Sequence, residues 1–157
     1  MLSRLMSTAY VATALAVGSG CGGAIHQTRT TLEITATALR EVDVIAAREY
    51  TSAAETALES SETVDEYTEK MTKWDDLVRS ANMLRAALTK ASELTDVAER
   101  MRNAEDAQDR LTMAMRCAGY AVSLVIRSLE AVGIPTPKIV QDVFILLGEE
   151  AGACGDS

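Results

Sequence analysis

Apolar and small side chains recur at every third or fourth position along most of this chain, the spacing that places them on one face of an α-helix. The first such stripe consists of Ile25, Thr28, Leu32, Thr35, Leu39, Val42, Ala46, Tyr50, Ala53 and Ala57. The second consists of Val64, Tyr67, Met71, Trp74, Val78, Ala81, Leu84, Leu88, Ala91, Leu94, Ala98 and Met101. The third consists of Ala107, Leu111, Ala114, Ala118, Ala121, Val125 and Leu129. Each stripe predicts a helix that buries one face.

The composition favours closely packed helices over a β-fold. Hydrophobic residues make up 48% of the chain and aromatic residues only 4%, so Ala, Leu, Val and Met carry the apolar content. The sequence has two prolines and no Asn-Gly or Asp-Gly pair, although hairpin-rich β proteins depend on such turn residues. We therefore expect an all-α fold of the helical-bundle or coiled-coil kind.

Local signals place a turn between the first two helices. Thr63 and Glu66 have the spacing of a capping box, in which Thr63 accepts a hydrogen bond from the amide of Glu66 while the Glu66 side chain reaches back. At about 1.5 Å per residue the two helices would be roughly 50 to 60 Å long. Similar lengths and a tight connection predict an antiparallel hairpin.

The third stripe and the residues after it complete the predicted bundle. Asn103 offers a helix cap at which the chain either breaks or bends. Residues 118–126 carry no charge, which is typical of a helix surrounded by protein; a self-association surface is the alternative. Gly133 is placed to end this helix, and a short fourth helix is expected over 137–147. The fold class is a three- to four-helix bundle with a loose tail at 148–157.

The first 20 residues have the layout of a secretion signal. Arg4 gives a positive start, residues 5–17 form an apolar segment, and three small residues follow. The apolar segment is shorter than the roughly 20 residues that a membrane-spanning helix needs. We expect cleavage that leaves residues 21–147 as a single helical domain, with a retained N-terminal anchor as an alternative.

The small residues directly before Cys21 resemble the lipobox of bacterial lipoproteins, although Gly18 stands where that family usually has an aliphatic residue. The resemblance covers residues 1–21 and implies that Cys21 is lipid-modified and becomes the mature N-terminus. Gly22 stands where the inner-membrane retention signal of enteric bacteria has Asp, which implies an outer-membrane anchor facing the periplasm. An ordinary signal peptide cut near this cysteine is the alternative.

The charge of the chain disfavours two kinds of partner. Fifteen Lys and Arg against twenty-three Asp and Glu give a net charge of −8, and no basic stripe is present. Phosphate backbones would be repelled, so nucleic-acid binding is not expected. Adsorption to anionic lipid is disfavoured for the same reason, so residence at a membrane requires an anchor.

The densest acidic segment falls at the expected hairpin tip. Between residues 55 and 69 six acids occur without one base: Glu55, Glu59, Glu62, Asp65, Glu66 and Glu69. We expect a solvated acidic tip, with docking to a basic partner as the alternative. The segment lacks calcium-loop spacing, so no metal site is expected.

Neither a catalytic site nor a cofactor site is expected. His26 is the only histidine and lacks partners for a catalytic or metal site. Glycines in residues 18–23 match a dinucleotide fingerprint but not its strand-to-helix context. Cys117 and Cys154 remain once Cys21 is set aside. In an oxidising envelope they most simply pair, which would staple the tail to the third helix; two free thiols or an intermolecular bridge remain alternatives.

These features together predict a lipid-anchored, non-enzymatic scaffold or interaction protein of the bacterial cell envelope. Its partners would be the membrane, through the N-terminal lipid, and either a second protein or another copy of the chain. One alternative is a phage- or plasmid-encoded lysis or exclusion lipoprotein, whose long hairpin reaches across the periplasm. Another is a helical bundle that carries an apolar ligand in an internal cavity.

Overall fold

The chain is almost entirely helical in the part that the structure describes, apart from the links at 61–63 and 132–137. The computed structural model describes residues 21–100 and 105–147, with side chains over 25–100 and 109–147. These ranges contain no strand, and their helices are α2 (Cys21–Ser60), α3 (Val64–Arg100), α4 (Glu105–Ala131) and α5 (Lys138–Leu147). The predicted all-α bundle of three to four helices is confirmed.

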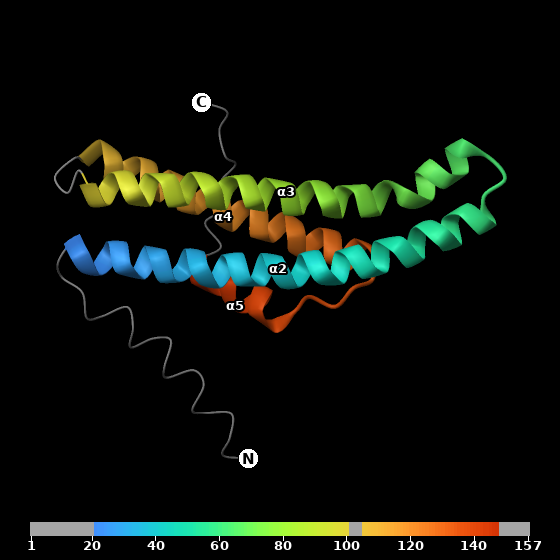
Figure 1. Ribbon diagram of the computed structural model, residues 1–157, viewed down its shortest axis with the longest axis horizontal. Helices are drawn as coiled ribbons and strands as arrows, with labels where there is room; N and C mark the ends of the chain where they lie inside the picture. Colours follow the sequence, from blue (N-terminus) through green and yellow to red (C-terminus); the bar gives the residue numbers. More distant parts are fainter. Residues whose placement is uncertain (1–20, 101–104, 148–157) are drawn as a thin grey trace, which may run out of the picture.

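The helices pack as a long hairpin with two further helices laid along one part of it (Figure 1). α2 and α3 run antiparallel, α4 returns along α3, and the short α5 lies against both α2 and α4. In the described residues no Cα atom of α2 comes within 8 Å of one in α4. Buried side chains of both helices nevertheless belong to one core, and α5 contacts each of the two helices. The leader, the Asn103 cap and the tail at 148–157 lie outside the described residues.

The turn between α2 and α3 is held by the predicted capping box, with one change. The amide of Glu66 donates to Thr63 Oγ1 at 3.2 Å, as expected. The Glu66 carboxylate accepts from the amide of Glu62 at 2.9 Å, one residue before the predicted contact. Lys70 Nζ donates to the carbonyl of Ser60 at 2.8 Å, which satisfies an acceptor that the end of α2 leaves open. Three short-range contacts thus fix the turn.

The buried face of α3 differs from the predicted stripe at Val64, at Val78 and at Leu94, which is half-buried beside the fully buried Thr95. Val64 and Val78 are 79% and 44% exposed, whereas Leu77, which the stripe omitted, is fully buried. The residues of α3 that face the neighbouring helices are instead spaced three and four positions apart in strict alternation: Trp74, Leu77, Ala81, Leu84, Leu88, Ala91, Thr95 and Ala98. This alternation is the 3.5-residue heptad period of coiled coils. The expected burial of Val64 and Val78 was therefore wrong.

The main core lies where all four helices meet. The uncharged segment 118–126 is buried or half-buried at every position, as expected for a helix surrounded by protein. Its members pack with side chains from the other three helices, the buried set being Ala38, Leu39, Val42, Leu77, Ala81, Leu84, Leu88, Ala121, Val122, Val125, Leu129, Val140 and Val143. The hydroxyls of Ser80 and Ser128 lie 3.0 Å apart and pair α3 with α4 beside this core.

The link from α4 to α5 has the predicted glycine cap. Gly133 has a φ of 77°, and its amide donates to the carbonyl of Glu130 at 3.0 Å. The amide of Ile134 donates to the carbonyl of Leu129 at 2.9 Å, which completes a Schellman motif. The carbonyl of Pro137 accepts the first helical bonds of the next helix, so α5 begins at Lys138, one residue later than predicted.

Beyond the end of α4 the hairpin continues as two helices alone, which Figure 1 shows at the end where α2 and α3 join. We call residues 50–75 the hairpin arm. Ala57 and Met71 are buried in it but belong to neither cluster of core residues in the body. None of the described helices combines the length and hydropathy that crossing a bilayer requires.

Candidate functional site

The six acidic residues singled out in the sequence all lie exposed on the outer part of the hairpin arm, and we refer to them as the acidic tip: Glu55, Glu59, Glu62, Asp65, Glu66 and Glu69. Within the described part of the chain none of these carboxylates forms an ion pair with Lys or Arg. Lys70, the nearest base in the sequence, instead donates to the end of α2. The tip therefore presents a largely uncompensated negative charge to the solvent.

Two aliphatic side chains are exposed within the same segment. Leu58, near the end of α2, is 71% exposed, and Val64, the first residue of α3, is 79% exposed. The sequence stripe had placed Val64 on the buried face, and Leu58 was not singled out at all. An exposed aliphatic side chain is ordinary by itself. Here two of them lie within an acidic segment, so the tip offers apolar contact as well as charge.

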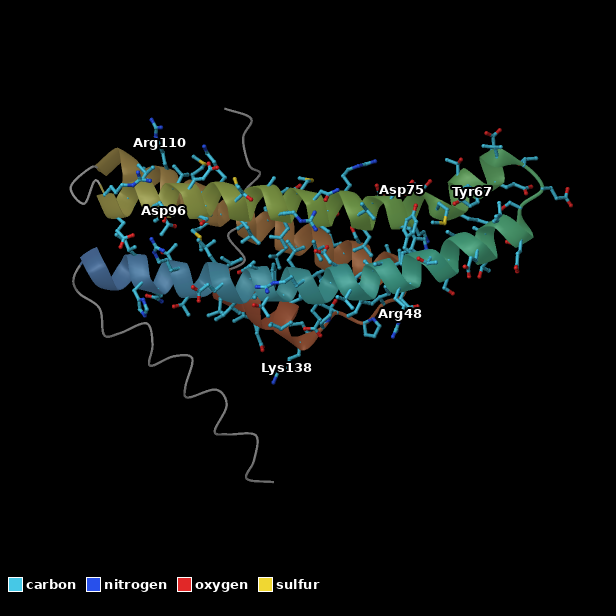
Figure 2. All side chains as sticks on the ribbon, viewed as in Figure 1. Arg48, Tyr67, Asp75, Asp96, Arg110 and Lys138 are labelled. Atoms are coloured by element: carbon cyan, nitrogen blue, oxygen red, sulfur yellow. The ribbon has the colours of Figure 1, made fainter. Side chains whose placement is uncertain are left out.

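Aromatic side chains join the two helices at the base of the arm. The rings of Tyr50 and Trp74 meet edge to face, with centroids 6.3 Å apart. The Tyr50 hydroxyl donates to Asp75 at 3.3 Å. Burial raises the pKa of the Tyr50 phenol, and the Asp75 carboxylate raises it further, because both disfavour the phenolate. Figure 2 places Asp75 and Tyr67 on the part of α3 that forms the arm.

Ion pairs fasten α2 to α3 in the body behind the arm. Arg29 Nη2 lies 2.9 Å from Asp96 and 2.5 Å from Glu99, near the end opposite the acidic tip. Arg85 Nη2 makes two contacts with the Asp43 carboxylate, at 3.0 and 2.9 Å. Figure 2 shows Asp96 on the side of α3 that faces α2. Since these side chains are about half exposed, each pair contributes roughly 0 to 1 kcal/mol, and it orients the helices more than it stabilises them.

A groove of about 810 Å³ runs between α3 and α4, and we call it the α3/α4 groove. Its apolar lining includes Met83, Leu94, Met113 and Tyr120. Met83 and Met113 are 43% and 60% exposed, so the groove opens to solvent. The sequence stripes do not reveal this groove, because its lining lies on the sides of two helices whose pairing the stripes do not specify.

The structure brings Cys117 into the α3/α4 groove, where its half-buried side chain is disulfide-bonded. Cys154, its predicted partner, lies outside the described residues, and the side chain of Cys21 does too. The backbone of Cys21 forms the first residue of α2. Its lipidation therefore stays a prediction, as does the pairing of Cys117 with Cys154.

The remaining candidates for chemistry are not gathered into a site. His26 is exposed on the first turns of α2. In the described ranges, no group of three or more His, Cys, Asp or Glu side chains converges as metal ligands would.

Comparison of the chain with protein families, with curated proteins and with solved structures finds no match. The acidic tip and the α3/α4 groove are thus the two surfaces from which a function can be argued.

Proposed function

We propose that this protein is a lipid-anchored, non-enzymatic scaffold of the bacterial cell envelope, whose acidic tip binds a basic protein partner. In this proposal the N-terminal lipid confines the chain to a membrane, and the hairpin arm carries the binding surface away from it. The partner is defined by its chemistry: a positively charged surface with some apolar area.

The hairpin arm is the observation that carries the proposal. The arm projects past α4, and among its described side chains only Trp74, at its base, packs against the main core. The arm bears six exposed carboxylates and two exposed aliphatic side chains. A concentration of like charge on one end of a molecule destabilises that end by self-repulsion, but it also attracts a partner of opposite charge. Binding would replace the repulsion with attraction, which is a physical reason for such a tip to be kept.

The position of Cys21 supports an anchored arrangement. Cys21 is the first of the 40 residues of α2, and the acidic tip lies at the other end of that helix. At about 1.5 Å per residue, a lipid on Cys21 and the tip would be separated by roughly 60 Å along the helix. An anchor at one end and a charged surface at the other are suited to reaching a partner at a distance from the membrane.

The exposure of the carboxylates supports a binding role over an enzymatic one. Acid–base catalysis needs carboxyl groups in unlike, partly buried environments, so that one stays protonated while the other is ionised. All six acidic residues of the tip are exposed, so their surroundings do not differ in this way.

A pair of charge-matched variants tests the binding surface. The tip variant carries Glu55→Gln, Glu59→Gln, Glu62→Gln, Asp65→Asn and Glu69→Gln, and it keeps Glu66 for the turn. The control variant carries five substitutions at exposed acids of the body: Glu33→Gln, Glu41→Gln, Glu93→Gln, Glu130→Gln and Asp142→Asn. Both variants lose five negative charges, so any difference between them reports where the charge lies.

Binding of a fluorescent lysine decapeptide, measured by anisotropy at low salt, compares these variants. At about 0.2 to 1 kcal/mol per exposed charge pair, we expect the tip variant to bind roughly tenfold more weakly than the wild type and the control variant to bind nearly as well. A photo-crosslinking residue at position 59 should capture one discrete envelope protein, and the same residue at position 41 should not. Equal weakening in both variants would refute a tip-specific surface.

Intact-mass analysis of the membrane fraction tests the anchor. The wild-type chain should begin at Cys21 and carry the additional mass of acyl chains. A Cys21→Ser variant should lack that mass and leave the membrane fraction. A wild-type chain that still begins at Met1, or one that is cut but not acylated, would refute lipid anchoring while leaving the peptide-binding result intact.

A further inference from the structure

The α3/α4 groove is part of a larger apolar surface. A second hollow of about 500 Å³ adjoins it along α3, with Met83 and Ala86 in the lining of both, and Val78 extends it toward the hairpin arm. We call the two hollows together the α3/α4 face. Met83 and Met113 are exposed in the same structure in which Cys117 is disulfide-bonded, so that bond leaves the face open. Exposed apolar area gathered on one side of a molecule often marks an interaction surface.

The charges on the α3/α4 face nearly balance one another. Three bases and two acids line it. Two of the bases are paired with acids on their own helix, Lys90 with Glu93 at 3.8 Å and Arg79 with Asp76 at 3.2 Å. With these two acids included, the face carries a charge of −1 in a chain whose net charge is −8. A strongly charged partner of either sign gains little from such a face, whereas a second copy of this acidic chain is repelled less here than elsewhere.

The shape of the face is complementary to itself. Its two most exposed large side chains in the groove, Met83 and Met113, come from different helices, and small residues lie between them: Ala86, Ala87, Ala114 and Ala121. Each methionine lies near the start of the lining segment of its own helix, and α3 and α4 run antiparallel, so the two lie toward opposite ends of the groove. A half-turn that brings two copies face to face therefore sets each flexible methionine against an alanine-lined part of the partner. A two-fold symmetric dimer needs a surface of this self-complementary kind.

The area of the face is enough for a weak dimer. Its lining on α3 runs from Val78 to Leu94, roughly 25 Å at about 1.5 Å per residue, and two packed helices are roughly 20 Å wide. Two such faces in contact bury roughly 1,000 Å² in total, which is about the smallest area of a specific interface. Interfaces of this size belong to weak, reversible complexes, so we expect a dissociation constant on the order of 1 to 100 μM.

We propose that the α3/α4 face is a self-association surface, through which two copies of this chain pack face to face as a reversible dimer. The contact is formed by α3 and α4 of each copy, with Met83 and Met113 of one copy packed against the small residues of the other. No residue of α2 or α5 lines the face, so Cys21 lies outside the contact, as does the acidic tip. The proposal does not depend on lipidation of Cys21 or on a partner at the acidic tip.

Sedimentation equilibrium of the full chain tests the dimer. A density-matched non-ionic detergent keeps the leader or an acyl chain from driving association, and it lets the mass of the protein alone be measured. The wild type should shift from one copy to two between roughly 1 and 100 μM. A variant with Met83→Glu and Met113→Glu brings four carboxylates into the contact of each dimer, and we expect it to dimerise roughly tenfold or more weakly.

A control variant gains the same charge away from the face. It carries Val44→Glu and Ile145→Glu, at positions that are 72% and 71% exposed and line neither hollow of the face. Its dissociation constant should stay within roughly threefold of the wild-type value. A wild type that remains a single copy up to about 500 μM would overturn the proposal. Equal weakening in the two variants, at unchanged circular dichroism, would overturn it as well.

Photo-crosslinking in cells that express two differently tagged copies locates the contact. A crosslinking residue at position 113 should yield a product that has twice the mass of the chain and carries both tags. The same residue at position 44, on α2, should not. A main product with a different protein, or equal yields of the dimer at both positions, would show that this face does not bind a second copy.

Discussion

The register of the α3 core can be tested with two neighbouring residues. Leu77 is fully buried in the main core, whereas Val78 is 44% exposed. Truncation of Leu77 to Ala removes apolar side-chain atoms from a packed site and leaves a cavity, for which the expected cost is about 2 to 5 kcal/mol. Truncation of Val78 to Ala removes partly solvated atoms and replaces a β-branched residue with the best helix former, so the expected change is within about 1 kcal/mol.

Urea unfolding followed by circular dichroism measures both free energies of unfolding. Leu77→Ala should lower the midpoint at an unchanged slope, because the surface exposed on unfolding changes little. In a thermal scan the same cost corresponds to a fall in Tm of roughly 3 to 5 °C per kcal/mol for a domain of this size. A larger loss for Val78→Ala than for Leu77→Ala would refute the heptad register of α3.

Three further substitutions probe local features of the fold. Gly133→Ala should lower stability by about 1 to 2 kcal/mol in urea unfolding, because φ is 77° there while no atom crowds the new Cβ. Thr63→Ala should cost about 1 kcal/mol and speed amide exchange at the start of α3, because the Glu66 amide loses its acceptor. Tyr50→Phe should remove the fall in wild-type stability at alkaline pH. The Tyr50 phenol has a higher pKa in the folded chain than in the unfolded chain, so it loses its proton first in the unfolded chain. The stability of the wild type is therefore unaffected below pH about 10 and falls as the pH rises through the raised pKa of the folded state.

The substitutions of Thr63 and Tyr50 each have a control in the same chain. Thr68→Ala removes a threonine within α3 whose hydroxyl donates only to the carbonyl four residues before it, and it should not destabilise the helix. Tyr120→Phe, at a tyrosine on α4 that is not among the groups acting on Tyr50, should leave the alkaline fall in stability in place. If Tyr50→Phe and wild type lose stability in parallel between pH 9 and pH 11, the contact with Asp75 does not couple folding to ionisation.

The features that could be predicted from sequence are those whose partners are near in the chain. The capping box at Thr63 and the cap at Gly133 use hydrogen bonds between residues at most five positions apart, and both were found from residue type and spacing alone. The exposure of the acidic tip was also foreseen, because six acids with no nearby base have no local means of burial.

The features that were missed depend on which helices meet. A stripe drawn at a helical period allows either Leu77 or Val78 to face inward, and the choice is made by the neighbours of α3, which sequence spacing does not reveal. The α3/α4 groove depends on the same pairing, since Met83 and Met113 come from different helices. Sequence alone therefore predicted the elements and the acidic tip, but not the second surface.

The length of the hairpin arm can differ without any change in the core of the bundle. Because residues 51–73, the outer part of the arm, pack as two helices outside the main core, a heptad added to or deleted from each helix there would keep the same faces in contact. Each such change moves the acidic tip by about 10 Å without altering a single contact of the body. The distance between the tip and Cys21 can thus vary in steps of one heptad, as the length of a spacer does, while the bundle that supports it stays the same.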